Sequence, residues 1–226
     1  MARTELVEYP YGAGGVPAFL ASPTEAAGPR AVVLLQEWWG LNGHMKDLAV
    51  RFAAQGYHAL VPDLYHGEIA NEPDEARKLA MALDRDRAVA EICAAVEYLQ
   101  GRAYPAEQVG VVGWCMGGGL ALSTASDCQG VAAAVCFYGR PLSPTDTARI
   151  SCPVLGLFAE HDQGIPVEAV RAFEAELARN QIVHEVHIYG EGAQHAFFND
   201  TRPHIFHPVA AADAWQRTLA WLERYT

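Results

Sequence analysis

The sequence predicts an α/β fold with a mostly parallel sheet and helices on both faces, the α/β-hydrolase fold. Two observations predict it. Short apolar runs rich in valine alternate with longer helical stretches, and every candidate catalytic residue follows the end of such a run. The chain has 226 residues, of which 51% are hydrophobic, so one domain over 1–226 can bury a sizeable core.

The elements follow in order along the chain. We predict strands at 4–9, 16–21, 31–37, 57–63, 109–114, 131–138, 152–159 and 183–189. Helices are predicted at 45–54, 73–99, 167–179 and 208–224, with one more directly after residue 115. Pro73 suits a first helical turn, and the helix that it begins has a break near 84–86.

The tract Gly113-Trp114-Cys115-Met116-Gly117 has the G-x-S-x-G pattern of a nucleophile elbow, with cysteine in place of serine. Glycines flank the central residue because its strained turn brings strand and helix together. Cys115 would then lie at a helix N-terminus, where thiolate and oxyanion are both favoured. The alternative is a buried core cysteine, since free cysteine often packs as a small apolar side chain.

The order of the acidic and basic residues after the elbow favours a catalytic role for Cys115. An α/β-hydrolase needs nucleophile, then Asp or Glu, then His. The loop after the strand at 152–159 contains Glu160 and Asp162, of which we choose Asp162 as the acid. A glycine-broken loop after the last strand ends in His195, the predicted base.

Composition excludes several classes of function. The net charge of −11 argues against nucleic acid and anionic membranes as partners. No apolar run is long enough to span a bilayer and no secretory signal begins the chain, so we expect a cytoplasmic protein. The five cysteines form no C-x-x-C pair, so neither a disulfide framework nor a zinc site is indicated. We expect no metal and no cofactor, because the histidines also lack ligand spacing: His44, His66, His161 and His184.

The chain resembles the dienelactone hydrolase family, the carboxymethylenebutenolidase-like branch of the α/β-hydrolases. The resemblance covers nearly the whole chain and rests on the elbow, the Asp162 loop, Gln36-Glu37-Trp38-Trp39-Gly40-Leu41-Asn42, Pro62-Asp63-Leu64-Tyr65 and Gly192-Ala193-Gln194-His195-Ala196-Phe197. It implies an ester or lactone hydrolase with the triad Cys115, Asp162 and His195.

The resemblance also implies a glutamate beside the nucleophile, Glu37, which would handle the thiol proton. The structural alternative is a carboxylate bound to loop amides or to an arginine. The backbone N–H groups of Trp38 and Met116 match the family's oxyanion hole, and each such donor lowers the barrier by ~3 kcal/mol.

The chain differs from the family at the positions that would bind the substrate. Its two carboxylate-binding arginines correspond to Pro73 and Asn199 here. Either the substrate is uncharged, or Arg140 or Arg202 supplies the charge from another direction, although surface arginine is the commoner situation. Tyr138, at a strand end, and His44, near Glu37, could line the pocket, and Tyr138 could equally be core.

Enol lactones and small esters, cleaved through a thioester, are the expected substrates. A general carboxylesterase or thioesterase would use the same residues on uncharged acyl groups, and a cysteine peptidase would need an extended groove. A small-molecule receptor on this scaffold would tend to lose part of the triad, which this chain keeps in order. The sequence leaves the oligomeric state and the natural substrate undecided.

Overall fold

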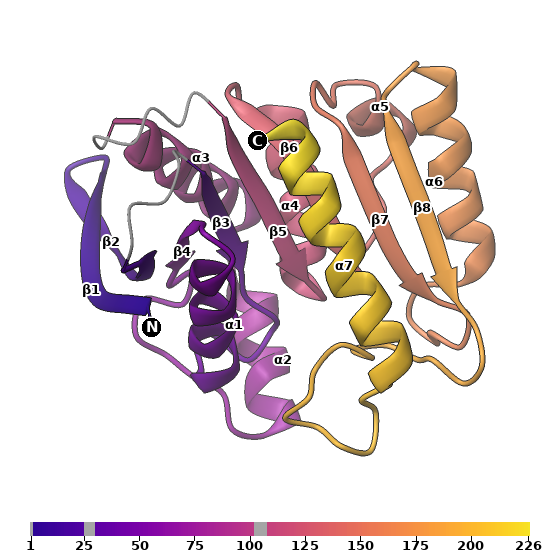
Figure 1. The fold of residues 1–226 in the computed structure, drawn as a ribbon, viewed down its shortest axis with the longest axis horizontal. Coiled ribbons are helices and arrows are strands. Elements are labelled where there is room, and N and C mark those ends of the chain that lie inside the picture. The colour runs from indigo at the N-terminus through magenta and orange to yellow at the C-terminus, as the bar shows by residue number, and fades with distance from the viewer. Residues whose placement is uncertain (1, 25–29, 102–107) are drawn as a thin grey trace.

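The computed structural model describes residues 2–24, 30–101 and 108–226, and an eight-stranded sheet forms its centre (Figure 1). The strand order is β1-β2-β4-β3-β5-β6-β7-β8. Only the β1–β2 and β2–β4 pairs are antiparallel, and all the others are parallel. The strands are β1 (Ala2–Tyr11), β2 (Gly14–Pro23), β3 (Ala31–Leu35), β4 (His58–Pro62), β5 (Val109–Trp114), β6 (Val131–Phe137), β7 (Val154–Ala159) and β8 (His184–Tyr189).

Helices cover both faces of the sheet. They are α1 (Gly43–Ala54), α2 (Pro73–Ala82), α3 (Arg85–Gly101), α4 (Met116–Asp127), α5 (Pro144–Thr147), α6 (Val167–Arg179) and α7 (Pro208–Tyr225). Alternate strand residues point to opposite faces, so Val33 and Val111 pack in the core with α3, α4 and α6. Val32 and Val112 pack in the second core with α1 and α7, which cross in front of the sheet in Figure 1. The predicted mostly parallel sheet with two covered faces is therefore confirmed.

The predicted long helix is divided in two. Helix α2 ends at Ala82 and α3 starts at Arg85, with Asp84 accepting a hydrogen bond from the backbone N–H of Arg87 at 3.1 Å. This N-terminal cap provides a physical reason for the break near 84–86. Within α2 only Ala76 is buried, so this helix contributes little to the core.

The cysteine prediction is wrong at two positions. Cys93 of α3 and Cys128, which follows α4, form a disulfide across 35 residues of chain. Their spacing matches no local motif, because packing of the two helices brings the thiols together. Cys115, Cys136 and Cys152 are free.

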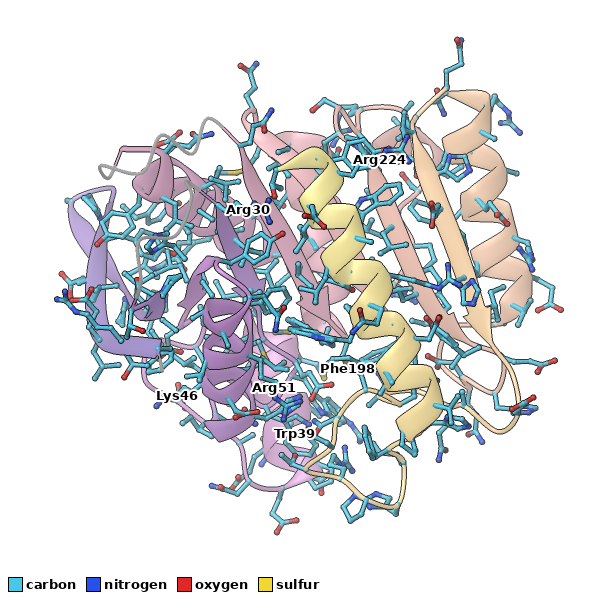
Figure 2. All side chains as sticks on the ribbon, in the orientation of Figure 1. Arg30, Trp39, Lys46, Arg51, Phe198 and Arg224 are labelled. Atoms are coloured by element: carbon cyan, nitrogen blue, oxygen red, sulfur yellow. A yellow bond between two sulfur atoms is a disulfide. The ribbon has the colours of Figure 1, made fainter. Side chains whose placement is uncertain are left out.

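The parallel strands all end at the same edge of the sheet, and the candidate site residues follow those ends. In Figure 2, Trp39, Arg51 and Phe198 lie at this end of the molecule. Across the three described ranges, no helix combines the length and apolar character needed to cross a membrane.

Candidate active site

Cys115 occupies a sharp turn between β5 and α4. Its backbone has φ 55° and ψ −116°, a left-handed conformation that is unfavourable for a residue with a side chain. The fold holds it there: the N–H of Cys115 donates to the carbonyl of Phe137 at 3.0 Å. A Cβ on Gly113 would collide with the carbonyl of Gly117, and one on Gly117 with the carbonyl of Leu35. Glycine at 113 and 117 is therefore required by the turn.

His195 and Asp162 form a short hydrogen-bonded pair. The Nδ1 of His195 lies 2.6 Å from the Oδ2 of Asp162. The other oxygen, Oδ1, accepts from the backbone N–H groups of Gly164 at 2.8 Å and Ile165 at 3.1 Å. Asp162 is buried, whereas Glu160 in the same loop is exposed. Asp162 is thus the carboxylate that orients the imidazole.

His195 also interacts with Cys115. Burial favours the neutral imidazole, but hydrogen bonds to Asp162 and Cys115 and the charges of both groups outweigh it and raise the pKa of His195 to about 10. The charges of Cys115 and Asp162 therefore favour the protonated form of the imidazole, which has both groups as partners.

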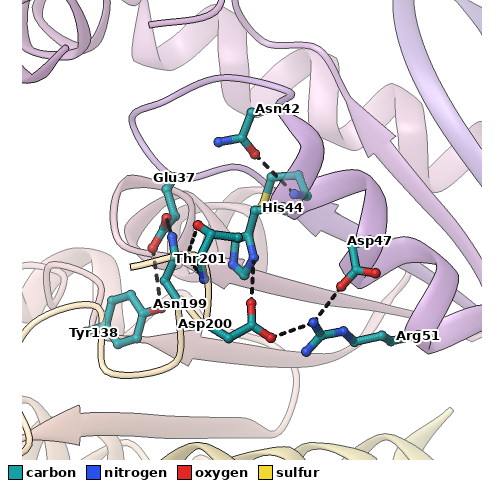
Figure 3. A network of polar contacts seen from close by, with 10 residues as sticks. Glu37, Asn42, His44, Asp47, Arg51, Tyr138, Asn199, Asp200 and Thr201 are labelled. Atoms are coloured by element: carbon teal, nitrogen blue, oxygen red, sulfur yellow. Dashed lines mark hydrogen bonds and ion pairs between the residues drawn. The ribbon is translucent and has the colours of Figure 1, made fainter. Parts of the chain in front are cut away.

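Glu37 lies just beyond the end of β3 and is 3% exposed. Its Oε2 accepts a hydrogen bond from the Nδ2 of Asn199 at 2.7 Å, and its Oε1 lies 3.4 Å from the Tyr138 hydroxyl, which donates to it (Figure 3). Both partners are neutral. The structural alternative of an arginine partner for Glu37 is not realised, and neutral donors satisfy the carboxylate.

Tyr138 is completely buried at the end of β6. Burial, followed by the negative charges of Glu37 and Cys115, holds the pKa of Tyr138 well above its ordinary value, so its hydroxyl remains a donor. Its ring lies 5.1 Å from the His195 ring, centroid to centroid. Tyr138 therefore contacts both Glu37 and His195.

Asn199 is 1% exposed, and all its polar atoms are occupied within the protein. Its Oδ1 accepts from the backbone N–H of Thr201 at 3.1 Å and from the Thr201 hydroxyl at 2.6 Å, while its amide donates to Glu37. Asn199 therefore links the Glu37 carboxylate to Thr201.

Asp200 ties this loop to α1. Arg51 of α1 pairs with the Oδ2 of Asp200 at 2.5 Å, and Asp47 pairs with the same guanidinium at 2.6 Å (Figure 3). His44 Nδ1 lies 3.5 Å from the Oδ1 of Asp200. His44, which could line the pocket, is buried in the first turn of α1, and burial lowers its pKa.

Tyr65 is a site residue that the sequence reasoning missed. Its hydroxyl donates to the carbonyl of Trp38 at 3.2 Å and lies 3.4 Å from the Sδ of Met116, so it touches both expected oxyanion-hole residues. Burial raises the pKa of Tyr65, and the negative charge of Cys115 raises it further, which places the phenol near the nucleophile. The available signal was Asp63, whose carboxylate accepts from the Tyr65 and Gly67 N–H groups and so builds this turn.

Arg140 and Arg202 lie outside this cluster of contacts. Arg202 stacks over Trp39, with its Cζ 5.1 Å from the ring centroid. Arg140 is exposed at the turn after β6. In the part of the chain that the structure describes, no three His, Cys, Asp or Glu side chains gather in a way that could hold a metal ion.

A strained turn at Cys115, an Asp–His pair and a mostly parallel sheet are together typical of an α/β-hydrolase. The chain belongs to the dienelactone hydrolase family, whose model matches residues 16–226, and is therefore a hydrolase of esters or lactones.

Individual relatives are similar over nearly their whole length. Protein usf of Aquifex pyrophilus is 32% identical over 230 residues, covering 98% of both chains. A provisionally named carboxymethylenebutenolidase of Escherichia coli K12 is 30% identical over 226 residues, covering 93% of this chain and 83% of that protein. A crystal structure of a provisionally named dienelactone hydrolase from Klebsiella pneumoniae superposes with a TM-score of 0.91 at 28% identity, covering 100% of both chains.

Proposed function

We propose that this enzyme hydrolyses enol lactones or small esters through a thioester on Cys115. One observation carries the proposal: Cys115 stands on the elbow while the His195–Asp162 pair, at 2.6 Å, faces it. This is the nucleophile, base and orienting acid that acyl transfer needs.

The reaction has two halves. The Cys115 thiolate adds to the substrate carbonyl, and the tetrahedral oxyanion accepts hydrogen bonds from the N–H groups of Trp38 and Met116. Collapse breaks the carbon–oxygen bond, His195 protonates the leaving oxygen, and the acyl group remains on sulfur as a thioester. Neutral His195 then takes a proton from water, whose oxygen attacks the thioester, and collapse releases the acid and restores the thiolate.

Two side chains support the first half in this proposal. Glu37 accepts the proton of a resting Cys115 thiol before the attack and returns it to the sulfur after the acid has left, while Asn199 and Tyr138 hold its carboxylate in place. Tyr65 positions the oxyanion hole through its contacts with Trp38 and Met116.

Enolate leaving groups suit a cysteine enzyme, because a thiolate departs from the tetrahedral intermediate more easily than an alkoxide does. Uncharged acyl esters or thioesters remain the second candidate, since Asn199 offers no cation where the family has an arginine. A small-molecule partner, no nucleic acid and no cofactor complete the proposal.

The test is mass spectrometry of the protein after brief incubation with p-nitrophenyl acetate and with an enol lactone. We expect one acyl adduct, on Cys115, and complete loss of turnover in Cys115→Ala. Cys136 and Cys152 serve as internal controls, because burial raises the pKa of each thiol to about 12 and keeps it unreactive. Turnover by Cys115→Ala, or an adduct on another residue, would disprove the covalent mechanism.

We also propose a cytoplasmic location, which suits a reactive thiol nucleophile. The Cys93–Cys128 disulfide is evidence against this location, because disulfides rarely persist in the cytosol and are typical of oxidising compartments. Cell fractionation, with thiol labelling of Cys93 and Cys128 in the isolated fractions, distinguishes the two locations.

A further inference from the structure

Glu91 is a buried carboxylate that the proposed mechanism does not use. It lies in the middle of α3, and its side chain is only 2% exposed. Its Oε1 accepts a hydrogen bond at 2.8 Å from the Nε of Arg87, which lies one helical turn earlier. The Nε2 of His66 lies 3.2 Å from the same oxygen. Partners of this kind are needed here, because an unpaired buried charge is strongly destabilising.

His66 is the partner that joins separate segments of the chain. Arg87 and Glu91 belong to one helix, so their ion pair fixes no tertiary arrangement. His66 instead belongs to the turn of residues 63–68 after β4, the Tyr65 turn. Its Nε2 also lies 3.5 Å from the Nη2 of Arg87, and the shorter distance to the carboxylate makes Glu91 its main partner. The contact between His66 and Glu91 therefore ties the Tyr65 turn to α3.

The backbone of His66 has an unusual conformation. Its φ is 51°, in the left-handed region that a residue with a side chain adopts at a cost in free energy. The Asp63 carboxylate builds the turn by accepting from the N–H groups of Tyr65 at 3.2 Å and Gly67 at 2.8 Å. Such a conformation persists where the surroundings determine it. Asp63 holds the backbone of the turn, and Glu91 holds the ring that projects from it.

The same turn contacts the expected oxyanion hole. The Tyr65 hydroxyl donates to the carbonyl of Trp38 at 3.2 Å and lies 3.4 Å from the Sδ of Met116. The turn also packs closely against the loop that contains Trp38, because a Cβ on Gly40 would lie 2.7 Å from the carbonyl of Glu68. The position of the Tyr65 turn therefore determines the position of the Trp38 backbone.

Packing between the Tyr65 turn and the helices beside it is incomplete. A cavity of about 220 Å³ is lined by His66, by Glu91, and by Leu79 and Leu83 near the junction of α2 and α3. Only Ala76 of α2 is buried, so this helix supports the turn weakly. His66 and Glu91 both border the cavity, and their contact holds the turn where apolar packing does not.

We propose that Glu91, through His66, is a positioning residue for the oxyanion hole. It holds the Tyr65 turn where the phenol fixes the Trp38 backbone and contacts Met116. The proposal rests on the proposed function, which assigns the oxyanion hole to these two residues. Loss of Glu91 should raise the energy of the transition state and leave substrate binding almost unchanged, because the donors act on the oxyanion.

The test is the kinetics of Glu91→Gln and His66→Asn with p-nitrophenyl acetate, together with inhibition by trifluoroacetophenone. The Cys115 thiolate adds to the ketone carbon, and the resulting oxyanion occupies the hole as the transition state does. We expect kcat to fall about tenfold, KM to stay within about twofold, and the inhibition constant to rise about tenfold. An unchanged kcat, or a lower kcat with an unchanged inhibition constant, would overturn the proposal.

The choice of variants separates positioning from folding. Asparagine adopts the left-handed conformation readily, so His66→Asn keeps the backbone of the turn and removes the ring. The His66 side chain is 37% exposed, so this variant should fold even if Glu91→Gln does not. The matched controls are Glu97→Gln, at an exposed position of α3, and Gln181→Asn, at another left-handed position with φ 56°. Both should equal wild type in all three constants.

A double-mutant cycle determines whether Glu91 acts through Tyr65. Tyr65→Phe keeps the ring and removes the hydroxyl that contacts Trp38. We expect Glu91→Gln to lower kcat little further in the Tyr65→Phe protein, because the contact that it positions is already lost. Independent losses that multiply in the double variant would overturn the proposal.

Hydrogen–deuterium exchange in Cys115→Ala protein separates this proposal from the proposed function, because it requires neither the nucleophile nor turnover. We expect the backbone amides of the Tyr65 turn to exchange several times faster when Glu91→Gln is added, and at an unchanged rate when Glu97→Gln is added. Equal rates in these two proteins would reject the positioning role of Glu91. Turnover by Cys115→Ala would reject the proposed function and leave the exchange result in place.

Discussion

Asp162 and Glu37 are both buried carboxylates of the candidate site, yet their partners differ in kind. Asp162 pairs with a cationic imidazole and with two backbone N–H groups. Glu37 has an amide and a phenol, both neutral. A buried charge is stable when paired and hydrogen-bonded, so Asp162 is suited to remain an anion that fixes His195. Among the residues that the structure describes, no cation pairs with Glu37, which suits the proton exchange with Cys115 that we propose for it.

We expect the largest loss of activity from substitutions of Asp162 and of its partner His195. Asp162→Asn keeps the shape but removes the charge that orients and stabilises the imidazolium, and His195→Ala removes the base itself. We expect kcat/KM for p-nitrophenyl acetate to fall about 10³–10⁴-fold in either variant. Glu160→Gln, an exposed neighbour in the same loop, is the control and should stay close to wild type. A larger loss at Glu160 than at Asp162 would show that the acid was wrongly chosen.

We expect a smaller loss of activity from substitution of Asn199, the hydrogen-bond partner of Glu37. Asn199→Leu removes the amide 2.7 Å from the carboxylate and leaves Glu37 buried with one weaker donor. We expect kcat to fall roughly tenfold and the free energy of unfolding, measured in urea, to fall by about 1–3 kcal/mol.

Asn180→Leu is the control, because Asn180 is an exposed asparagine at the end of α6 and should leave kcat unchanged. A double-mutant cycle with Glu37→Gln should be strongly non-additive. Additive losses would mean that Asn199 does not act through Glu37.

The smallest effect concerns the dependence of the free energy of unfolding on pH. The pKa of His195 is raised in the folded protein from 6.5 to about 10. A raised pKa contributes stability that is fully present below pH 6.5 and is lost as pH rises through about 10. The unfolding free energy of wild type should therefore exceed that of His195→Gln by less at pH 10 than at pH 6. Denaturation in urea at both values measures this, and a difference that grows with pH would contradict the ion pair.

Features that depend on the local sequence of one segment could be predicted. The apolar runs indicated the strands, and the order of Cys115, Asp162 and His195 indicated the site, because parallel strands bring their carboxyl ends to one edge. The break between α2 and α3 was also visible in Asp84 and its neighbours.

Features that join separate segments could not be predicted in the same way. The Asn199–Glu37 hydrogen bond spans 162 residues, and Tyr65 meets Met116 across 51 residues. The disulfide depends on how α3 packs beside α4. The spacing of residues along the chain does not encode such contacts between distant segments.

The left-handed turn at residue 115 has a consequence for the history of such enzymes. Glycines and backbone hydrogen bonds hold that turn, and neither depends on the sulfur atom. A lineage can therefore exchange cysteine for serine there, a change of one atom, without redesigning the surrounding scaffold. Natural selection can alter the chemistry of the side chain at residue 115 separately from the architecture that presents it.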